Sequence, residues 1–189
     1  MGCLAIHNMD KVSFNIMRGN KSENNYGTLI GKNSFFRVIN DLKTLEFEDD
    51  VDLEKCVTSC SDTSVGNGLA IIISDFFTES NWKKAVDYLL YKRRQVLLLQ
   101  VNTPEELDPT YDGRVNLIDS EAVDVSDPKN LKIKVTNSMQ RAYIEAIAEF
   151  KQDIKEFCSK RDVEYVSFST DTPIEKALFR ELLKVGIVS

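Results

Sequence analysis

The sequence contains a single histidine, His7, and four cysteines among its 189 residues. The cysteines are Cys3, Cys56, Cys60 and Cys158. None of their spacings matches a CxxC redox pair or a zinc-ligand pattern, because Cys56 and Cys60 are four residues apart on an expected helix. We therefore expect reduced thiols and no metal held by cysteine. With one histidine and no G-x-S-x-G segment, the chain also lacks the pattern of a Ser-His-Asp hydrolase.

Long apolar runs, phosphate-binding loops and an excess of positive charge are missing as well. No run approaches the roughly 18 apolar residues of a membrane-spanning helix, so we expect no membrane span and a cytoplasmic location. Gly66-Asn67-Gly68 precedes an apolar strand instead of following one, which excludes a dinucleotide-binding turn. The formal net charge of −6 argues against nucleic acid as a partner, since such proteins carry a basic surface.

The organisation that is present is an alternation of apolar strands with amphipathic helices. Leu69–Ile73 and Val96–Leu99 are predicted as buried strands, with a helix over Trp82–Leu90 between them. A strand, helix and strand at this spacing predict a parallel sheet with a right-handed crossover. Further strands are predicted at 12–17, 28–30 and 163–168, and further helices at 35–45, 49–62, 139–157 and 174–186.

One segment breaks this rhythm. Apolar and polar residues alternate around Val115 and again around Ile133, with the turn signal Tyr111-Asp112-Gly113 before them. This pattern predicts an antiparallel hairpin or small flap at about 105–136, added to the parallel sheet. No stretch rich in glycine, serine or proline divides the chain, so we expect a single α/β domain over residues 1–189.

A candidate site follows the buried strand Leu69–Ile73. Ser74 and Asp75 stand at its carboxyl end, and ligands of open α/β sheets bind outside these ends. A hydroxyl beside a carboxylate suits a hard cation such as Mg²⁺. The other interpretation is that the Asp75 side chain caps the turn that follows the strand. The sequence leaves both interpretations open.

The stretch from Gly68 to Phe77 resembles the signature of the family called domain of unknown function 58, a branch of the von Willebrand factor A-like fold. Its strand and "PEE-x-DP" run are similar to Val96–Pro109, and its "L-x-D-x-E" hairpin is similar to Leu117–Glu121. Arg141-Ala142-Tyr143, Tyr165 and Thr170–Pro173 follow in the family's order. The resemblance covers essentially the whole chain.

The resemblance implies a doubly wound, mostly parallel sheet with a metal-ion-dependent adhesion site at its carboxyl edge. That site combines a D-x-S-x-S loop, a threonine and an aspartate, and Ser74-Asp75 matches the third loop. Val51 stands where the threonine is expected, and the chain begins inside the first helix at Leu4–Asp10. The resemblance therefore implies an N-terminally shortened domain with a degenerate site and no Mg²⁺ or other cofactor.

The missing strand would lie between Val12–Met17 and Leu69–Ile73, so these strand edges are expected either to be exposed, which favours a homodimer, or to pair with each other. The family further implies a partner, a MoxR-type AAA+ ATPase. We expect a non-catalytic protein-binding module, with Asp52, Asp75, Asp108 and Asp119 at its interaction edge. The alternatives are a small metal-dependent hydrolase that uses Asp52, Asp75 and Asp119, and a remnant without activity.

Overall fold

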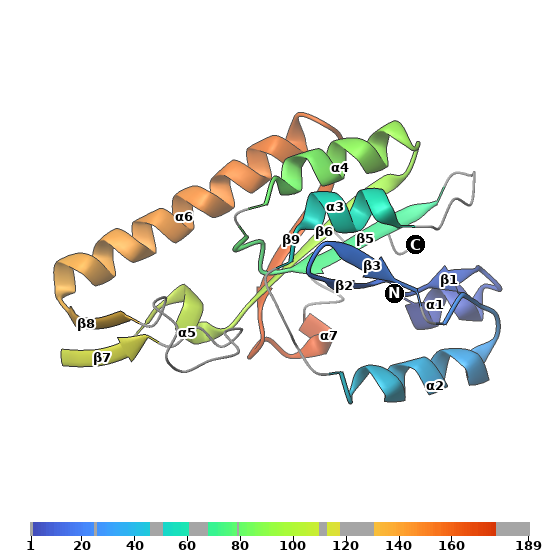
Figure 1. The fold of residues 1–189 in the computed structure, drawn as a ribbon, viewed down its shortest axis with the longest axis horizontal. Coiled ribbons are helices and arrows are strands. Elements are labelled where there is room, and N and C mark those ends of the chain that lie inside the picture. The colour runs from blue at the N-terminus through green and yellow to red at the C-terminus, as the bar shows by residue number, and fades with distance from the viewer. Residues whose placement is uncertain are drawn as a thin grey trace. The chain divides into compact units, whose positions relative to one another are not determined.

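The computed structural model describes residues 2–24, 26–45, 51–60, 68–78, 80–109, 113–117 and 131–176. These residues form two compact units that alternate along the chain (Figure 1). The N-terminal unit contains the described residues of Met1–Ser64 and Thr78–Ala85. The sheet unit contains those of Val65–Phe77, Val86–Asp119 and Val125–Ser189. This division does not test whether the chain is a single domain, and that expectation stays a prediction.

The N-terminal unit is built from three helices and two pairs of short antiparallel strands. Its elements are α1 (Gly2–His7), β1 (Val12–Ser13), β2 (Ile16–Arg18), β3 (Lys21–Glu23), β4 (Thr28–Leu29), α2 (Lys32–Leu42) and α3 (Leu53–Ser59). β1 pairs with β4, and β2 pairs with β3. The single strand predicted at 12–17 is therefore wrong: it is two strands with different partners, divided at Phe14 and Asn15.

The core of this unit consists of apolar side chains from α1, β4 and α2. Its buried members are Ile6, Leu29, Phe35 and Val38. The ring of Phe14 packs on Phe35 with centroids 5.9 Å apart, so the break between β1 and β2 turns an aromatic side chain into the core. α3 contacts β2 and β3, where the buried Cys56 thiol lies 3.1 Å from the Lys21 carbonyl oxygen.

The sheet unit contains a parallel three-stranded sheet in the order β5-β6-β9. Its elements are β5 (Leu69–Ser74), the second part of α4 (Trp82–Tyr91), β6 (Gln95–Asn102), α5 (Pro104–Leu107), β7 (Gly113–Leu117), β8 (Leu131–Val135), α6 (Asn137–Ser159), β9 (Glu164–Ser169) and α7 (Ile174–Lys176). Both crossovers run in the same direction across the sheet, so right-handed connections place α4 and α6 on one face. The parallel βαβ arrangement predicted from the sequence is confirmed.

β6 is the central strand, and β5 is an edge strand within the described part of the chain. Every residue from Val96 to Gln100 is buried, as expected of a strand with neighbours on both sides. In β5, by contrast, Leu69 is 40% exposed and Ile73 is 68% exposed. The prediction that β5 is a buried strand is therefore wrong for Leu69 and Ile73. Its apolar composition fits a buried strand, but composition does not specify the number of neighbouring strands.

The predicted hairpin is present, but it is a separate sheet. β7 and β8 pair antiparallel, with Val115 opposite Ile133. They form a two-stranded sheet of their own, so the expectation that the hairpin adds to the parallel sheet is wrong. The four cysteines are free thiols, and only Cys56 and Cys158 are buried. Among the described helices, none has the length and apolar character that a membrane crossing requires.

Candidate interaction site at the carboxyl edge of the sheet

The three parallel strands end at one edge of the sheet, where Ser74, Asn102 and Ser169 are their last residues. Asn102 and Ser169 are paired in register on neighbouring strands. The loops that follow carry Asp75 after β5 and Asp108 after α5. This edge is where open α/β sheets bind ligands, and it brings two of the four predicted edge carboxylates onto neighbouring loops.

The Ser74–Asp75 pair forms a tight turn at the end of β5. Phe77 N donates to Asp75 Oδ1 at 3.0 Å, and Phe76 N donates to Ser74 Oγ at 3.0 Å. Phe76 adopts a φ of 63°, which is unfavourable for a bulky side chain, and its ring is almost fully buried. The structure thus shows Asp75 capping its turn, which is one of the two interpretations of the sequence. A metal-ligand role for Ser74 and Asp75 is not tested by this geometry and stays a prediction.

A chain of hydrogen bonds across all three strands holds this turn in place. Gln100 is fully buried in β6, and its Nε2 donates to the Asp75 backbone carbonyl at 2.9 Å. The Tyr165 hydroxyl of β9 donates to Gln100 Oε1 at 2.5 Å. Burial raises the pKa of Tyr165, so the hydroxyl stays protonated as a donor at neutral pH. β9 therefore fixes the position of the turn after β5 through a side chain of β6.

The loop after β6 is fastened in the same way. Glu106 accepts from Thr103 N at 2.9 Å in a capping box that begins α5. The Tyr143 hydroxyl of α6 donates to the Glu106 carbonyl at 2.8 Å, and Gln140 Nε2 donates to the Pro109 carbonyl at 2.6 Å. Two side chains of the long helix thus hold the loop that carries the exposed Asp108.

Among the described residues, two buried polar atoms at this edge have no hydrogen-bond partner: Asn102 Oδ1 and Ser169 Oγ. Both belong to the register pair that ends β6 and β9. The amide nitrogen of Asn102 is engaged, because its Nδ2 donates to Glu106 Oε2 at 3.4 Å. A buried polar atom without a partner lowers the free energy of unfolding. The two atoms therefore make this edge less stable than it would be with every polar group hydrogen-bonded.

Asp52, another of the predicted edge carboxylates, belongs to the N-terminal unit, where it caps α3. Its Oδ1 accepts from Lys55 N at 3.0 Å, and its Oδ2 lies 3.0 Å from Lys55 Nζ. The hydrogen bond from the Lys55 backbone, followed by that from its side chain, lowers the pKa of Asp52. The fourth, Asp119, lies outside the described residues. No group of three or more histidine, cysteine, aspartate or glutamate side chains in the described ranges is arranged to hold a metal ion.

The loop that aligns with the family's threonine position makes backbone contacts within the N-terminal unit. The Thr78 hydroxyl donates to the Val51 carbonyl at 3.0 Å, and Leu53 N donates to Ser80 Oγ at 3.1 Å. These bonds tie the start of α3 to the segment that precedes α4. The sequence offers Ser80, beside Asn81, as a candidate cap of α4, whereas nothing in the position of Thr78 distinguishes it from a surface residue.

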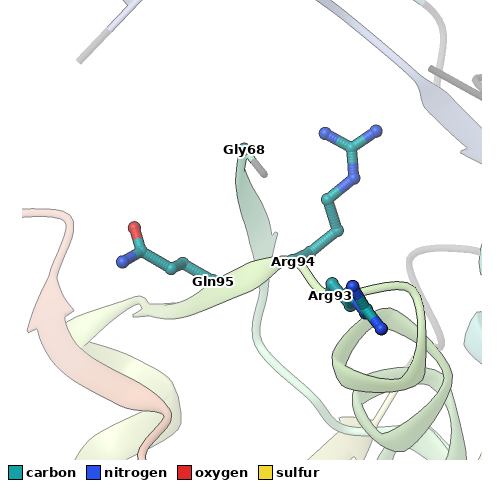
Figure 2. Close-up of a pocket in the computed structure, with 4 residues that line it drawn as sticks. All are labelled: Gly68, Arg93, Arg94 and Gln95. Carbon is teal, nitrogen blue, oxygen red and sulfur yellow. The ribbon is translucent and has the colours of Figure 1, made fainter. Parts of the chain in front are cut away.

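A hollow of about 430 Å³ lies at the opposite, amino end of β5 and β6 (Figure 2). It is lined by Gly68, Arg93, Arg94 and Gln95. Arg94 Nη1 lies 2.6 Å from the position that a Cβ atom on Gly68 would occupy, so the guanidinium lies directly against this glycine. The sequence explains these arginines only as cations at the end of α4, where they complement the helix dipole.

Comparison with known proteins agrees with this architecture. Residues 1–153 match the family described as Protein of unknown function DUF58. The solved structure of the conserved hypothetical protein BatB from Bacteroides thetaiotaomicron is similar, with a TM-score of 0.51 and 14% sequence identity. The similarity covers 95% of this chain and 81% of that chain, and at this identity it shows the fold alone. No curated protein matches the chain.

Proposed function

The chain belongs to the family described as Protein of unknown function DUF58, and on this premise we propose that it works as a non-catalytic protein-binding module. The proposal includes the von Willebrand factor A-like form of the α/β fold, a degenerate metal-ion-dependent adhesion site and a cytoplasmic location. Its main support is the hydrogen-bonded chain from Tyr165 through Gln100 to the carbonyl of Asp75. This chain holds a carboxylate in a defined place at the carboxyl edge.

A carboxylate held in this way suits recognition of a cationic group. Asp75 Oδ1 accepts from Phe77 N, whereas Oδ2 makes no hydrogen bond within the described residues. The turn is already ordered, so a partner binds without the entropic cost of ordering it. Phe77 stands beside the carboxylate, is 43% exposed and packs on Phe150 with ring centroids 5.5 Å apart. A charged group next to a supported aromatic ring is typical of the residues that dominate binding energy.

The proposed partner is a MoxR-type AAA+ ATPase, as the family resemblance implies. Asp108 is exposed on the neighbouring loop and gives the edge a second carboxylate. The net charge of −6 suits a partner with a basic surface, because complementary charge accelerates association. We expect binding to weaken as the salt concentration rises.

The test is calorimetric titration of the whole chain with a MoxR-type ATPase from the same organism. Asp75→Asn and Phe77→Ala are each expected to weaken binding by about tenfold. Glu164→Gln is the matched control, because Glu164 is exposed and is the first residue of β9, at the end of the sheet opposite to the carboxyl edge. Wild-type affinity in Asp75→Asn, or absence of binding by the wild-type chain, would reject the proposal.

The hydrolase alternative requires Asp52, Asp75 and Asp119 around a metal ion. Asp52 already accepts from Lys55 as a helix cap, and its lowered pKa makes it a weak general base. Titration with Mg²⁺ and Mn²⁺ separates the two functions. Micromolar metal binding that is lost in Asp75→Asn would favour metal-dependent adhesion or hydrolysis over the metal-free module. A remnant without activity predicts neither metal nor ATPase binding.

A further inference from the structure

One face of α6 contacts both loops that carry the edge carboxylates. Its contact residues are Gln140, Tyr143 and Phe150, which are three and seven residues apart and therefore lie on the same side of the helix. Further along this side, Ile154 and Phe157 are buried, and α6 contacts β9. The C-terminal half of the helix is thus packed into the sheet unit, and its N-terminal half uses the same side to hold the loops.

Asp108 stands between the two points at which α6 holds its loop. The Tyr143 hydroxyl donates to the Glu106 carbonyl at 2.8 Å, and Gln140 Nε2 donates to the Pro109 carbonyl at 2.6 Å. One carbonyl precedes Asp108 in the chain and the other follows it. None of the four residues of α5 is buried, so packing contributes little to the position of this loop. The two hydrogen bonds from α6 therefore contribute much of what fixes the backbone at Asp108.

The same helix supports the turn that carries Asp75. Phe150 packs on Phe77 with ring centroids 5.5 Å apart, and Phe77 N donates to Asp75 Oδ1. Tyr143 and Phe150 are seven residues apart, which corresponds to two helical turns, or about 10.5 Å along the helix axis. An α-helix keeps this length, so the support of the Asp75 turn and the support of the neighbouring loop have a fixed spacing.

We propose that Tyr143 and Gln140 are positioning residues of the carboxyl-edge site: through α6 they hold Asp108 in a fixed arrangement with Asp75. This inference rests on the proposed function and deepens it, because it adds residues that act through Asp108 instead of contacting the partner. With both loops ordered before binding, a basic partner meets two carboxylates without the entropic cost of ordering either loop. The Tyr143 hydroxyl is a donor at neutral pH, because burial and then the charge of Glu106 raise its pKa.

Amide hydrogen exchange measures the order of the Asp108 loop in the chain alone. The Asp108 amide donates to the Pro104 carbonyl at 2.9 Å, so its exchange requires this loop to open. Tyr143→Phe removes one donor to the loop and keeps the ring, whereas Gln140→Met removes the second donor at a similar side-chain length. Each variant is expected to speed exchange of the Asp108 amide about fivefold, the effect of losing one hydrogen bond. The Phe77 amide, in the other loop, is expected to keep its wild-type rate.

Two further variants serve as controls for the exchange measurement. Tyr91→Phe removes the hydroxyl of a tyrosine that is 80% exposed on α4, and it is expected to change neither rate. Phe150→Leu removes the aromatic contact with Phe77, and it is expected to speed exchange of the Phe77 amide while the Asp108 amide keeps its rate. An Asp108 amide that exchanges at the wild-type rate in Tyr143→Phe would overturn the positioning role. Equal acceleration of both amides in that variant would overturn it as well, because it would show a general loosening of the sheet unit.

Calorimetric titration with the MoxR-type ATPase tests whether the positioning matters for binding. Tyr143→Phe is expected to weaken binding about fivefold in the wild-type and Asp75→Asn backgrounds, but by less than about twofold in Asp108→Asn, because it acts through Asp108. A merely structural role would weaken binding equally in all three backgrounds, and that result would overturn the inference. Unchanged binding by Tyr143→Phe in the wild-type background would also overturn it. Absence of binding by the wild-type chain would reject the proposed function, whereas the exchange rate at Asp108 would still decide whether α6 positions its loop.

Discussion

Replacing Tyr165 with phenylalanine removes one oxygen atom and tests the hydrogen-bonded chain at the carboxyl edge. The hydroxyl is the only partner that the described residues offer to Gln100 Oε1, and Gln100 is fully buried. Tyr165→Phe therefore leaves a buried carbonyl oxygen without a donor, which costs about 1–3 kcal/mol. The phenylalanine ring keeps the apolar contacts of tyrosine and offsets none of this cost. We expect a loss of about 2 kcal/mol in the free energy of unfolding.

The assay is urea unfolding of Tyr165→Phe, Gln100→Leu and the double variant, followed by circular dichroism. At this chain length a loss of about 2 kcal/mol corresponds to a melting temperature lowered by about 4–8 °C. The double variant is expected to cost less than the sum of the two single variants, because Gln100→Leu removes the oxygen that Tyr165→Phe leaves unpaired. A Tyr165→Phe variant within about 0.5 kcal/mol of wild type, or strictly additive effects, would refute the hydrogen-bonded chain.

Three further predictions concern single side chains. Burial raises the pKa of Cys158 from 9.0 to about 11, so the folded state binds the thiol proton more tightly than the unfolded state does. The free energy of unfolding, measured by denaturant titration, is therefore expected to fall between pH 9 and about pH 11. In Cys158→Ala the same fall is expected to be less steep. Asp52→Ala removes the cap of α3 and is expected to lower the unfolding free energy by about 1 kcal/mol, whereas Asp52→Asn, which can still cap, loses less. Ser169→Ala removes a buried hydroxyl that has no partner in the described part of the chain, so its thermal unfolding is expected at or above the wild-type temperature. A clear decrease would show that Ser169 Oγ is engaged.

The elements of the sheet unit were predictable from the sequence wherever the pattern of apolar residues matches the burial of those residues in the fold. β6 is a continuous apolar run and is buried from Val96 to Gln100, and the apolar stripe of α4 follows helical spacing. The family resemblance implied an exposed edge on β5, whereas the apolar composition of β5 alone does not predict it, since an apolar strand looks the same at the centre and at the edge. The division between β1 and β2 also depends on tertiary contacts, because Phe14 packs on Phe35 from a distant helix.

The candidate site was predictable only in part. Ser74 and Asp75 were recognised from their position after an apolar strand, and the turn they form agrees with one of the two interpretations. Gln100 was missed, although a polar residue inside a run of buried apolar residues is a signal for a hydrogen-bonded role. Its partner Tyr165 lies 65 residues further along the chain, and no local pattern connects the two.

The wide sequence separation of the paired strands also affects the timing of folding during synthesis. Leu97 of β6 pairs in register with Glu164 of β9, and 67 residues separate them. At a synthesis rate of about 5–20 residues per second, β6 waits about 3–13 s on the ribosome before β9 has been made. During that interval β6 has one unpaired edge, and burial of Gln100 lacks the Tyr165 donor. Newly made chains are therefore expected to need a chaperone, or low expression, to escape aggregation before translation ends.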